Sequence, residues 1–395
     1  MRTLSVTLLL AVATTAPASS PDPKRLAVPP EVTLKAQELV RQLGSDDFTD
    51  REAAHERLAK MGRLAKPALS AAVATNPDPE VRSRCRELLP KAAAEDMKAR
   101  LDTFLADADG KYDHDLPGWN EFRKITGSNA AVRELFTEMM NDPTNRALLM
   151  AFGTSSSDLG ALVGNRRMEF YNWRFPRVAN GVRRDPTPAD VTALLLAESF
   201  AEAHKVPRTI PISTLFITPG FSQAVGEKTE RGAAIRAVAG KWIGTRDDPA
   251  QMSQALTFAS NLNLPEASGL AAKLLSSGTT TPIRLNAAYT VAKLDGKGHA
   301  AALEKALDDT ASQVVRTSVN GQLVSREVQV RDAALAALVM MSGQDTEAYG
   351  FVEMYKGAGN VRFTYTARHL PEDARQKAFD KWTAWRAKNP DWAKK

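Results

Sequence analysis

A short pattern of polar and apolar positions recurs along the chain: an arginine, a small residue three positions later and an aliphatic residue seven positions later. Positions with these spacings lie on one face of an α-helix, so every copy predicts a helix that buries the same face. Helices that recur in this way predict an array of stacked helices, and such arrays usually bind partners. The four copies begin at Arg51, Arg82, Arg284 and Arg331, with Ala54, Cys85, Ala287 and Ala334 as the small residues and Leu58, Leu89, Val291 and Leu338 as the aliphatic ones.

Further apolar stripes at helical spacing surround the first two copies. Leu39, Val40 and Leu43 form one stripe, which ends at Gly44, and Pro67 stands where a helix tolerates a first-turn proline. The arginines of the first two copies are 31 residues apart. This spacing fits a repeat built from a pair of helices.

Four runs of residues define this N-terminal block more closely: Leu39-Val40-Arg41-Gln42-Leu43-Gly44-Ser45-Asp46-Asp47-Phe48, Arg51-Glu52-Ala53-Ala54, Lys66-Pro67-Ala68-Leu69 and Val81-Arg82. Together they resemble HEAT-like repeats, in the short form common in exported bacterial proteins. The resemblance is close over residues 34–92 and looser over residues 230–345. It implies an all-α fold, an irregular HEAT-like α-solenoid, and a non-catalytic scaffold that binds a protein partner through its concave helical face.

One β-hairpin is expected to interrupt the helices. Residues 313–319 and 322–328 are rich in β-branched side chains and flank Asn320-Gly321. Asn-Gly between two such runs is the strongest short hairpin signal, because both residues accept the backbone angles of a tight turn. The sequence therefore predicts a hairpin insertion near residues 313–328, which also explains the longer spacing from Arg284 to Arg331.

The first 18 residues have the layout of a secretory signal peptide. Met1-Arg2 is weakly basic, residues 4–13 are apolar, and Ala16-Pro17-Ala18 supplies small residues for cleavage before Ser19. The alternative is a disordered cytosolic leader. We therefore expect an exported protein, periplasmic or secreted. We also expect no stable membrane insertion, because later apolar segments are too short.

The patterns divide the chain into six parts. These are a signal peptide over residues 1–18, a Pro-rich tether without helix or strand over 19–32, HEAT-like repeats over 33–100, an atypical helical segment over 101–186, a helical HEAT-like region with the hairpin over 187–345, and a C-terminal cap over 346–395. In the cap, a basic helix over residues 373–392 is expected to cover the last exposed repeat face with Phe379, Trp382 and Trp385.

Composition adds little to the choice of function. The chain is 43% hydrophobic but only 7% aromatic, with alanine dominant, which suits closely packed helices. The net charge is +6, and removal of residues 1–18 deletes only Arg2 and leaves +5, a value compatible with acidic partners. Cys85 is the single cysteine, so we expect a small buried residue and no intramolecular disulfide.

No motif nominates a catalytic residue or a cofactor. His55-Glu56 begins like a zinc-protease motif, but Ala59 occupies the second ligand position. The glycine-rich residues 153–164 lack the Lys-Ser/Thr pair of a phosphate-binding loop. We therefore expect a protein that is not an enzyme. A hydrolase with a site in the irregular middle segment remains as one alternative.

The acidic stretch around Gly110 is the best metal candidate. Its carboxylates suit a hard cation such as calcium, but leucines stand where the first and twelfth ligands of a calcium loop belong. We therefore expect a solvated acidic loop and assign no metal. The acids are Asp107, Asp109, Asp113 and Asp115, and the leucines are Leu105 and Leu116.

A basic and aromatic stretch near the middle of the chain supports a second alternative function. Arginines among aromatic rings can bind anionic polymers such as polysaccharide or nucleic acid. The other interpretation is that the rings enter the core while the arginines stay solvated or pair with acids from elsewhere. The candidate residues are Arg166, Arg167, Arg174, Arg177, Arg183, Arg184, Tyr171 and Trp173. The protein partner, the oligomeric state and the choice between periplasm and cell exterior stay open.

Overall fold

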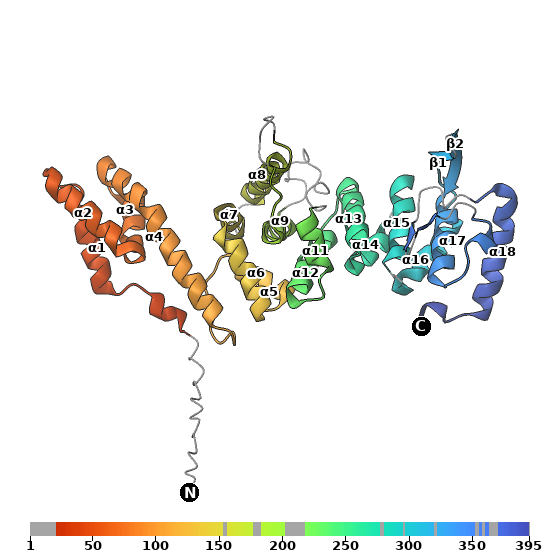
Figure 1. Cartoon of the computed structure of the whole chain (residues 1–395), viewed down its shortest axis with the longest axis horizontal. Coiled ribbons are helices and arrows are strands. Elements are labelled where there is room, and N and C mark those ends of the chain that lie inside the picture. Colours follow the sequence, from red (N-terminus) through yellow and green to blue (C-terminus); the bar gives the residue numbers. More distant parts are fainter. Residues whose placement is uncertain are drawn as a thin grey trace, which may run out of the picture. The chain divides into compact units, whose positions relative to one another are not determined.

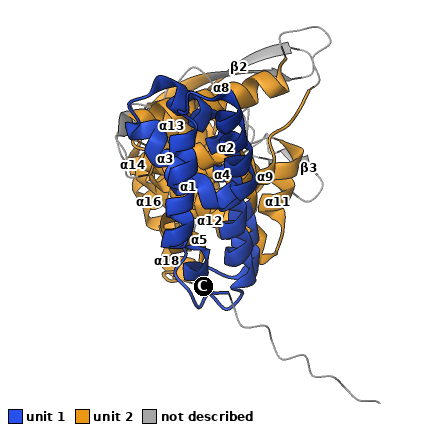
Figure 2. Cartoon of the chain, turned by 90° about the vertical axis from the view of Figure 1, so that its left-hand side faces the viewer, with its two compact units in different colours: residues 1–116, 128–137 blue, residues 117–127, 138–395 orange. Residues whose placement is uncertain are grey.

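The computed structural model is mostly helical, with two small antiparallel hairpins (Figure 1). It describes residues 21–152, 156–176, 183–201, 218–276, 280–294, 297–319, 322–351, 355–357, 360–362 and 370–394. The chain forms two compact units, residues 1–116 with 128–137 and residues 117–127 with 138–395 (Figure 2). Within the described part, no helix is both long and apolar enough to cross a membrane.

The first unit is built from four complete α-helices and two short 3₁₀ helices in its described part. Its core holds the small and aliphatic residues of the first two repeat copies, and Ala54, Leu58 and Cys85 are buried. Leu89, the aliphatic residue of the second copy, is only partly buried, and Leu88 lies deeper. The elements are η1 (Pro23–Leu26), α1 (Pro30–Gln42), α2 (Phe48–Met61), η2 (Gly62–Ala65), α3 (Lys66–Thr75) and α4 (Pro79–Ala106).

The prediction of a tether without helix is wrong for its described part. Residues 23–26 form the 3₁₀ helix η1, and α1 begins at Pro30, inside the predicted tether. Asp22 caps η1 by accepting from the Lys24 amide, and the Arg63 guanidinium donates to the Leu26 carbonyl at 2.9 Å. A long-range hydrogen bond therefore fixes a segment that its prolines alone would leave extended.

The repeated arginine has a local structural role in the first unit. Arg51 Nη1 donates to the carbonyls of Ser45 and Asp46, at 2.7 and 3.0 Å. Arg82 Nη1 contacts the carbonyls of Asn76 and Pro77 in the same way, at 2.7 and 2.8 Å. Each arginine therefore closes the turn that enters its helix. Asp47 and Asp78, four residues earlier, are the helix N-caps.

The later copies use their arginines differently. Arg284 pairs with Asp309 at 2.8 Å, and Arg331 donates to the Gln329 side chain at 2.6 Å. A fifth arginine follows the first two more closely, because Arg146 donates to the Met140 carbonyl four residues after the N-cap Asp142.

The second unit contains the remaining helices, and α6 (Ala130–Asn141) crosses the boundary between the units. α9 contacts α7, α8, α11 and α12. The helices are α5 (Trp119–Thr126), α7 (Pro143–Met150), α8 (Ser156–Arg174), α9 (Pro188–Phe200), α11 (Pro219–Gly226), α12 (Glu230–Gly244), α13 (Pro249–Leu262), α14 (Ser268–Ser276), α15 (Thr281–Lys293), α16 (Ala300–Lys305), α17 (Val330–Met341) and α18 (Glu372–Lys388). Short 3₁₀ turns are η4 (Pro265–Ala267), η5 (Lys297–His299), η6 (Ala306–Asp308), η7 (Glu347–Tyr349) and η9 (Trp392–Lys394).

The predicted hairpin is confirmed. β1 (Ser312–Val319) pairs antiparallel with β2 (Gln322–Gln329), and Val319 lies opposite Gln322. A second, shorter hairpin was not predicted from the sequence. It consists of β3 (Tyr355–Gly357) and β4 (Asn360–Arg362).

The C-terminal helix packs on the last repeat copy. α18 contacts α17, and Arg375 of α18 pairs with the buried Asp332 of α17. Trp382 is buried and stacks on Trp385 with ring centres 5.2 Å apart. The predicted basic helix ends at Lys388, before its expected end, and the following η9 returns a third tryptophan to the cluster.

Candidate functional site

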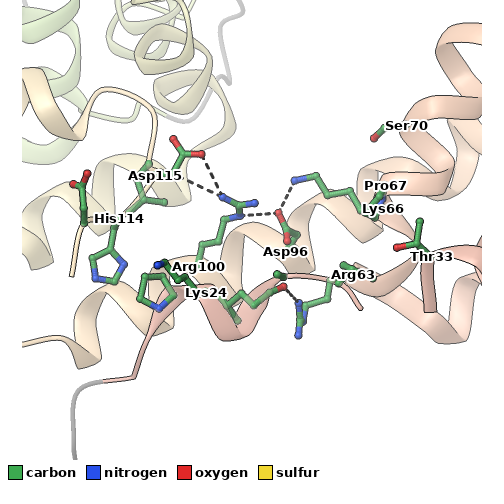
Figure 3. Close-up of a pocket in the computed structure, with 16 residues that line it drawn as sticks. Lys24, Thr33, Arg63, Lys66, Pro67, Ser70, Asp96, Arg100, His114 and Asp115 are labelled. Atoms are coloured by element: carbon green, nitrogen blue, oxygen red, sulfur yellow. Dashed lines mark hydrogen bonds and ion pairs between the residues drawn. The ribbon is translucent and has the colours of Figure 1, made fainter. Parts of the chain in front are cut away.

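The first unit contains a pocket of about 550 Å³, a volume typical of ligand sites (Figure 3). Its walls come from η1, the start of α1, η2, α3, α4 and the segment after α4. The lining residues are Pro23, Lys24, Leu26, Ala27, Val28, Thr33, Arg63, Lys66, Pro67, Ser70, Asp96, Arg100, Asp113, His114, Asp115 and Leu116.

Helical spacing brings the polar groups to the pocket. Lys66 and Ser70 are four residues apart on α3, and Asp96 and Arg100 are four apart on α4, so each pair shares one helix face. Arg63 joins them from η2, where its backbone amide donates to Glu95 at 3.1 Å.

Asp96 is the central acid of the pocket and is only 5% exposed. Its Oδ2 lies 2.5 Å from Lys66 Nζ and 3.0 Å from Arg100 Nε. Burial alone would raise the pKa of Asp96, but Lys66 and Arg100 outweigh it and hold that pKa below its ordinary value. Asp96 therefore stays ionised and fixes both cations in place.

His114 lies at the edge of the pocket and is anchored from behind. Its Nε2 lies 3.0 Å from Oδ2 of Asp107, a fully buried carboxylate that also accepts from the amides of Lys111 and Tyr112. Burial would raise the pKa of Asp107, but these hydrogen bonds and the nearby Arg133 lower it overall. This cluster fixes the segment that closes the pocket.

The acidic stretch proposed from sequence is thus not a uniform solvated loop. Asp107 is an internal anchor, whereas Asp109, Asp113 and Asp115 are exposed. Asp107 is held inward by the amides of Lys111 and Tyr112 and by His114, so it does not point outward with the other acids. Across the described residues, no three His, Cys, Asp or Glu side chains are grouped to hold a metal ion.

Arg166 of the predicted anionic-ligand patch is completely buried. Its guanidinium contacts Asn145 at 2.8 Å, Asp142 and Asp190 at 3.0 Å, and Glu169 at 2.7 Å. Asp190 also forms a capping box with Thr187 at the start of α9. Arg166 is therefore part of the core that joins α7, α8 and α9.

Arg167 is buried as well. It pairs with Glu198 of α9, which also receives Arg246 Nη1 at 3.0 Å. Arg166 and Arg167 of the candidate anionic-ligand patch therefore do not face solvent. Acids distant in the sequence bind them, as the other interpretation of this stretch proposed.

The other described patch residues lie at the end of α8 and just before α9. Arg174 is largely buried, with Nη1 4.0 Å from Asp185, and Tyr171 and Trp173 are partly buried. Arg183 and Arg184 are exposed, and the Arg184 guanidinium lies 3.9 Å from the centre of the Trp173 ring. Arg177 lies outside the described residues.

Sequence reasoning missed the pocket residues Arg63, Lys66, Asp96 and Arg100. The Asp96–Arg100 spacing is a readable signal, but it resembles any surface ion pair on a helix. Their convergence needs the packing of α3 on α4. Comparison of the chain with protein-family models, curated proteins and solved structures gave no match.

Proposed function

We propose that the chain is a non-catalytic, exported HEAT-like scaffold that binds a protein partner by seating a short extended segment of it in the pocket of the first unit. The observation that carries the proposal is the pocket itself, with ordered polar groups and apolar walls in one cavity of about 550 Å³. The signal-like residues 1–18 and the repeat pattern support export and the scaffold.

The pocket groups are held in place before any ligand arrives. Asp96 fixes Lys66 and Arg100, and the Leu26 carbonyl fixes Arg63. Such preorganisation favours binding because fewer side chains lose freedom when the ligand enters.

The arrangement supports binding better than hydrolysis. A nucleophile must lie within hydrogen-bond reach of its base, and Ser70 and His114 lie at opposite ends of the pocket (Figure 3). Nε2 of His114 contacts the buried Asp107, and Asp96 is held by two cations. These groups act as a fixed frame for a ligand.

A peptide selection tests the proposal. The full chain without residues 1–18 would be used to select binders from a displayed library of random peptides. Binding of the selected peptides would then be measured for Ser70→Trp, which fills the pocket from an exposed position, and for Ser83→Trp, an exposed control outside the pocket lining.

We expect selected peptides to lose at least about tenfold in affinity to Ser70→Trp and little to Ser83→Trp, because only the first indole occupies their site. If every selected peptide binds both variants equally, the pocket is not the binding site and the proposal is wrong.

A further inference from the structure

The charges inside the pocket are unbalanced. Three cations, Arg63, Lys66 and Arg100, line it, while Asp96 is its buried acid. Lys24 adds a fourth cation from η1. Asp113 and Asp115 also line the pocket, so four cations face three carboxylates, and the one positive charge in excess is what a further carboxylate would balance.

The cations also have donor capacity beyond their described contacts. The Lys66 ammonium carries three N–H groups, and the contact described for it is with Asp96. Arg63 carries five N–H donors, of which Nη1 contacts the Leu26 carbonyl. The Lys66 side chain is 33% exposed, so solvent and ligands reach its charged end.

Apolar residues stand beside these cations. Leu26 and Val28 come from η1 and the segment after it, Pro67 from α3, and Leu116 from the segment that His114 anchors. A ligand that suits this pocket therefore carries a negatively charged group and an apolar group close to each other. A peptide with an acidic and an aliphatic side chain has this chemistry.

We propose, resting on the function proposed above, that the bound segment of the partner is acidic: an Asp or Glu carboxylate sits against Lys66 and Arg63, and an adjacent apolar side chain contacts Leu26 and Pro67. In Figure 3 the Lys66 ammonium extends toward Asp96, and Arg63 lies on the other side of that carboxylate. The carboxylate accepts charge-assisted hydrogen bonds from both cations.

The rim favours an acidic peptide over a dense polyanion. Asp113 and Asp115 are exposed pocket residues, and Asp115 lies 4.0 Å from Arg100. Asp113 and Asp115 would repel the repeated phosphates or sulfates of a polyanion at short range. A peptide with a single carboxylate meets less repulsion, because only that one group has to pass the two acids to reach Lys66.

The test uses the peptides selected above, synthesised in pairs that differ by Glu→Gln or Asp→Asn. Affinities would be measured by fluorescence anisotropy for the full chain, for Lys66→Gln and for Lys98→Gln. Lys98 is a matched control, because it lies on α4 outside the pocket and pairs only with the exposed Asp102 in the described contacts.

We expect the acidic peptide to bind at least about tenfold more tightly than its amide partner. Lys66→Gln should remove most of this difference, and Lys98→Gln should preserve it. Asp115→Asn should tighten the acidic peptide about twofold, because it removes a like charge from the rim.

Lys66→Gln removes one partner of the buried Asp96 and could therefore disturb folding. A second pair of variants tests the same charge effect without this substitution. Ser70→Glu and Ser70→Gln keep both Lys66 and Asp96 and differ only in charge, and the glutamate, four residues after Lys66, competes with the peptide carboxylate for that ammonium. Ser70→Glu should weaken the acidic peptide about fivefold more than Ser70→Gln does.

Three outcomes overturn the inference. The first is equal affinity for acidic and amide peptides. The second is a set of pocket-bound peptides without acids, which leaves the proposed function intact. The third is displacement of the peptide by heparin at concentrations where a random acidic peptide has no effect. Selected peptides whose affinity is unchanged by Ser70→Trp would contradict the proposed function instead.

Discussion

Replacement of Arg375 by methionine should detach the C-terminal helix from the last repeat. Arg375 Nε and Nη2 donate to the two oxygens of Asp332 at 3.0 and 3.1 Å, and Nη2 also reaches the Leu370 carbonyl. Asp332 is completely buried, so the variant leaves a carboxylate in the core without its described partner.

The expected loss is large. Removal of one partner from a buried ion pair typically costs about 3–5 kcal/mol of unfolding free energy. The double variant Asp332→Leu/Arg375→Met removes both charges and should therefore lose less than the single variant.

The effect should also depend on pH. Burial, the largest influence, raises the pKa of Asp332 above its ordinary 3.8 despite the pair with Arg375. A raised pKa means that the folded state binds the Asp332 proton more tightly than the unfolded state does. Protonation of Asp332 therefore stabilises the folded state fully below pH 3.8, and this contribution is lost as the pH rises through the pKa of Asp332 in the folded state. Without Arg375 the pKa of Asp332 should rise further. The loss of unfolding free energy in Arg375→Met should therefore be larger at about pH 7 than at about pH 5.

Urea unfolding followed by tryptophan fluorescence measures this loss, with Trp382 and Trp385 of α18 among the six tryptophans that contribute to the signal. Lys377→Met, at an exposed position of the same helix, is the control. A loss below about 1 kcal/mol, or one equal to that of Lys377→Met, would refute the role given to the buried pair.

Three further perturbations test other parts of the fold. Arg82→Met should lose about 1–3 kcal/mol in urea unfolding, because it removes hydrogen bonds to two carbonyls, and an unchanged midpoint would contradict this. Asp107 has a lowered pKa, so its stabilisation is complete above pH 3.8 and lost as the pH falls through the folded value. The melting-temperature gap between the wild type and Asp107→Asn should accordingly shrink in acid, and a gap independent of pH would argue against it. Burial raises the pKa of the Cys85 thiol, so a disulfide reagent should label it only after denaturation, and rapid labelling of the folded chain would count against that burial.

Local patterns predicted the elements that depend on nearby residues. The turn residues Asn320-Gly321 located the first hairpin, and the small residues Ala54 and Cys85 marked buried helix faces. The same spacing marks Arg146, because Asp142 precedes it by four residues as Asp47 precedes Arg51.

Contacts between distant residues set what the sequence could not predict. Arg166 looks like a surface cation until α8 packs near Asn145 and Asp190, which lie 21 and 24 residues away. Leu26 looks like part of a tether until Arg63, 37 residues later, donates to its carbonyl. The pocket has the same origin, since Lys66 and Asp96 are 30 residues apart.

A double-mutant cycle between the protein and its peptide tests the central claim most directly. The cycle combines Lys66→Gln in the full chain with Glu→Gln in a selected acidic peptide, at low and high salt. If the peptide carboxylate contacts Lys66, the two changes should couple by at least about 1 kcal/mol, and the coupling should fall as salt screens the pair. Losses that simply add at both salt concentrations would show that the carboxylate binds elsewhere.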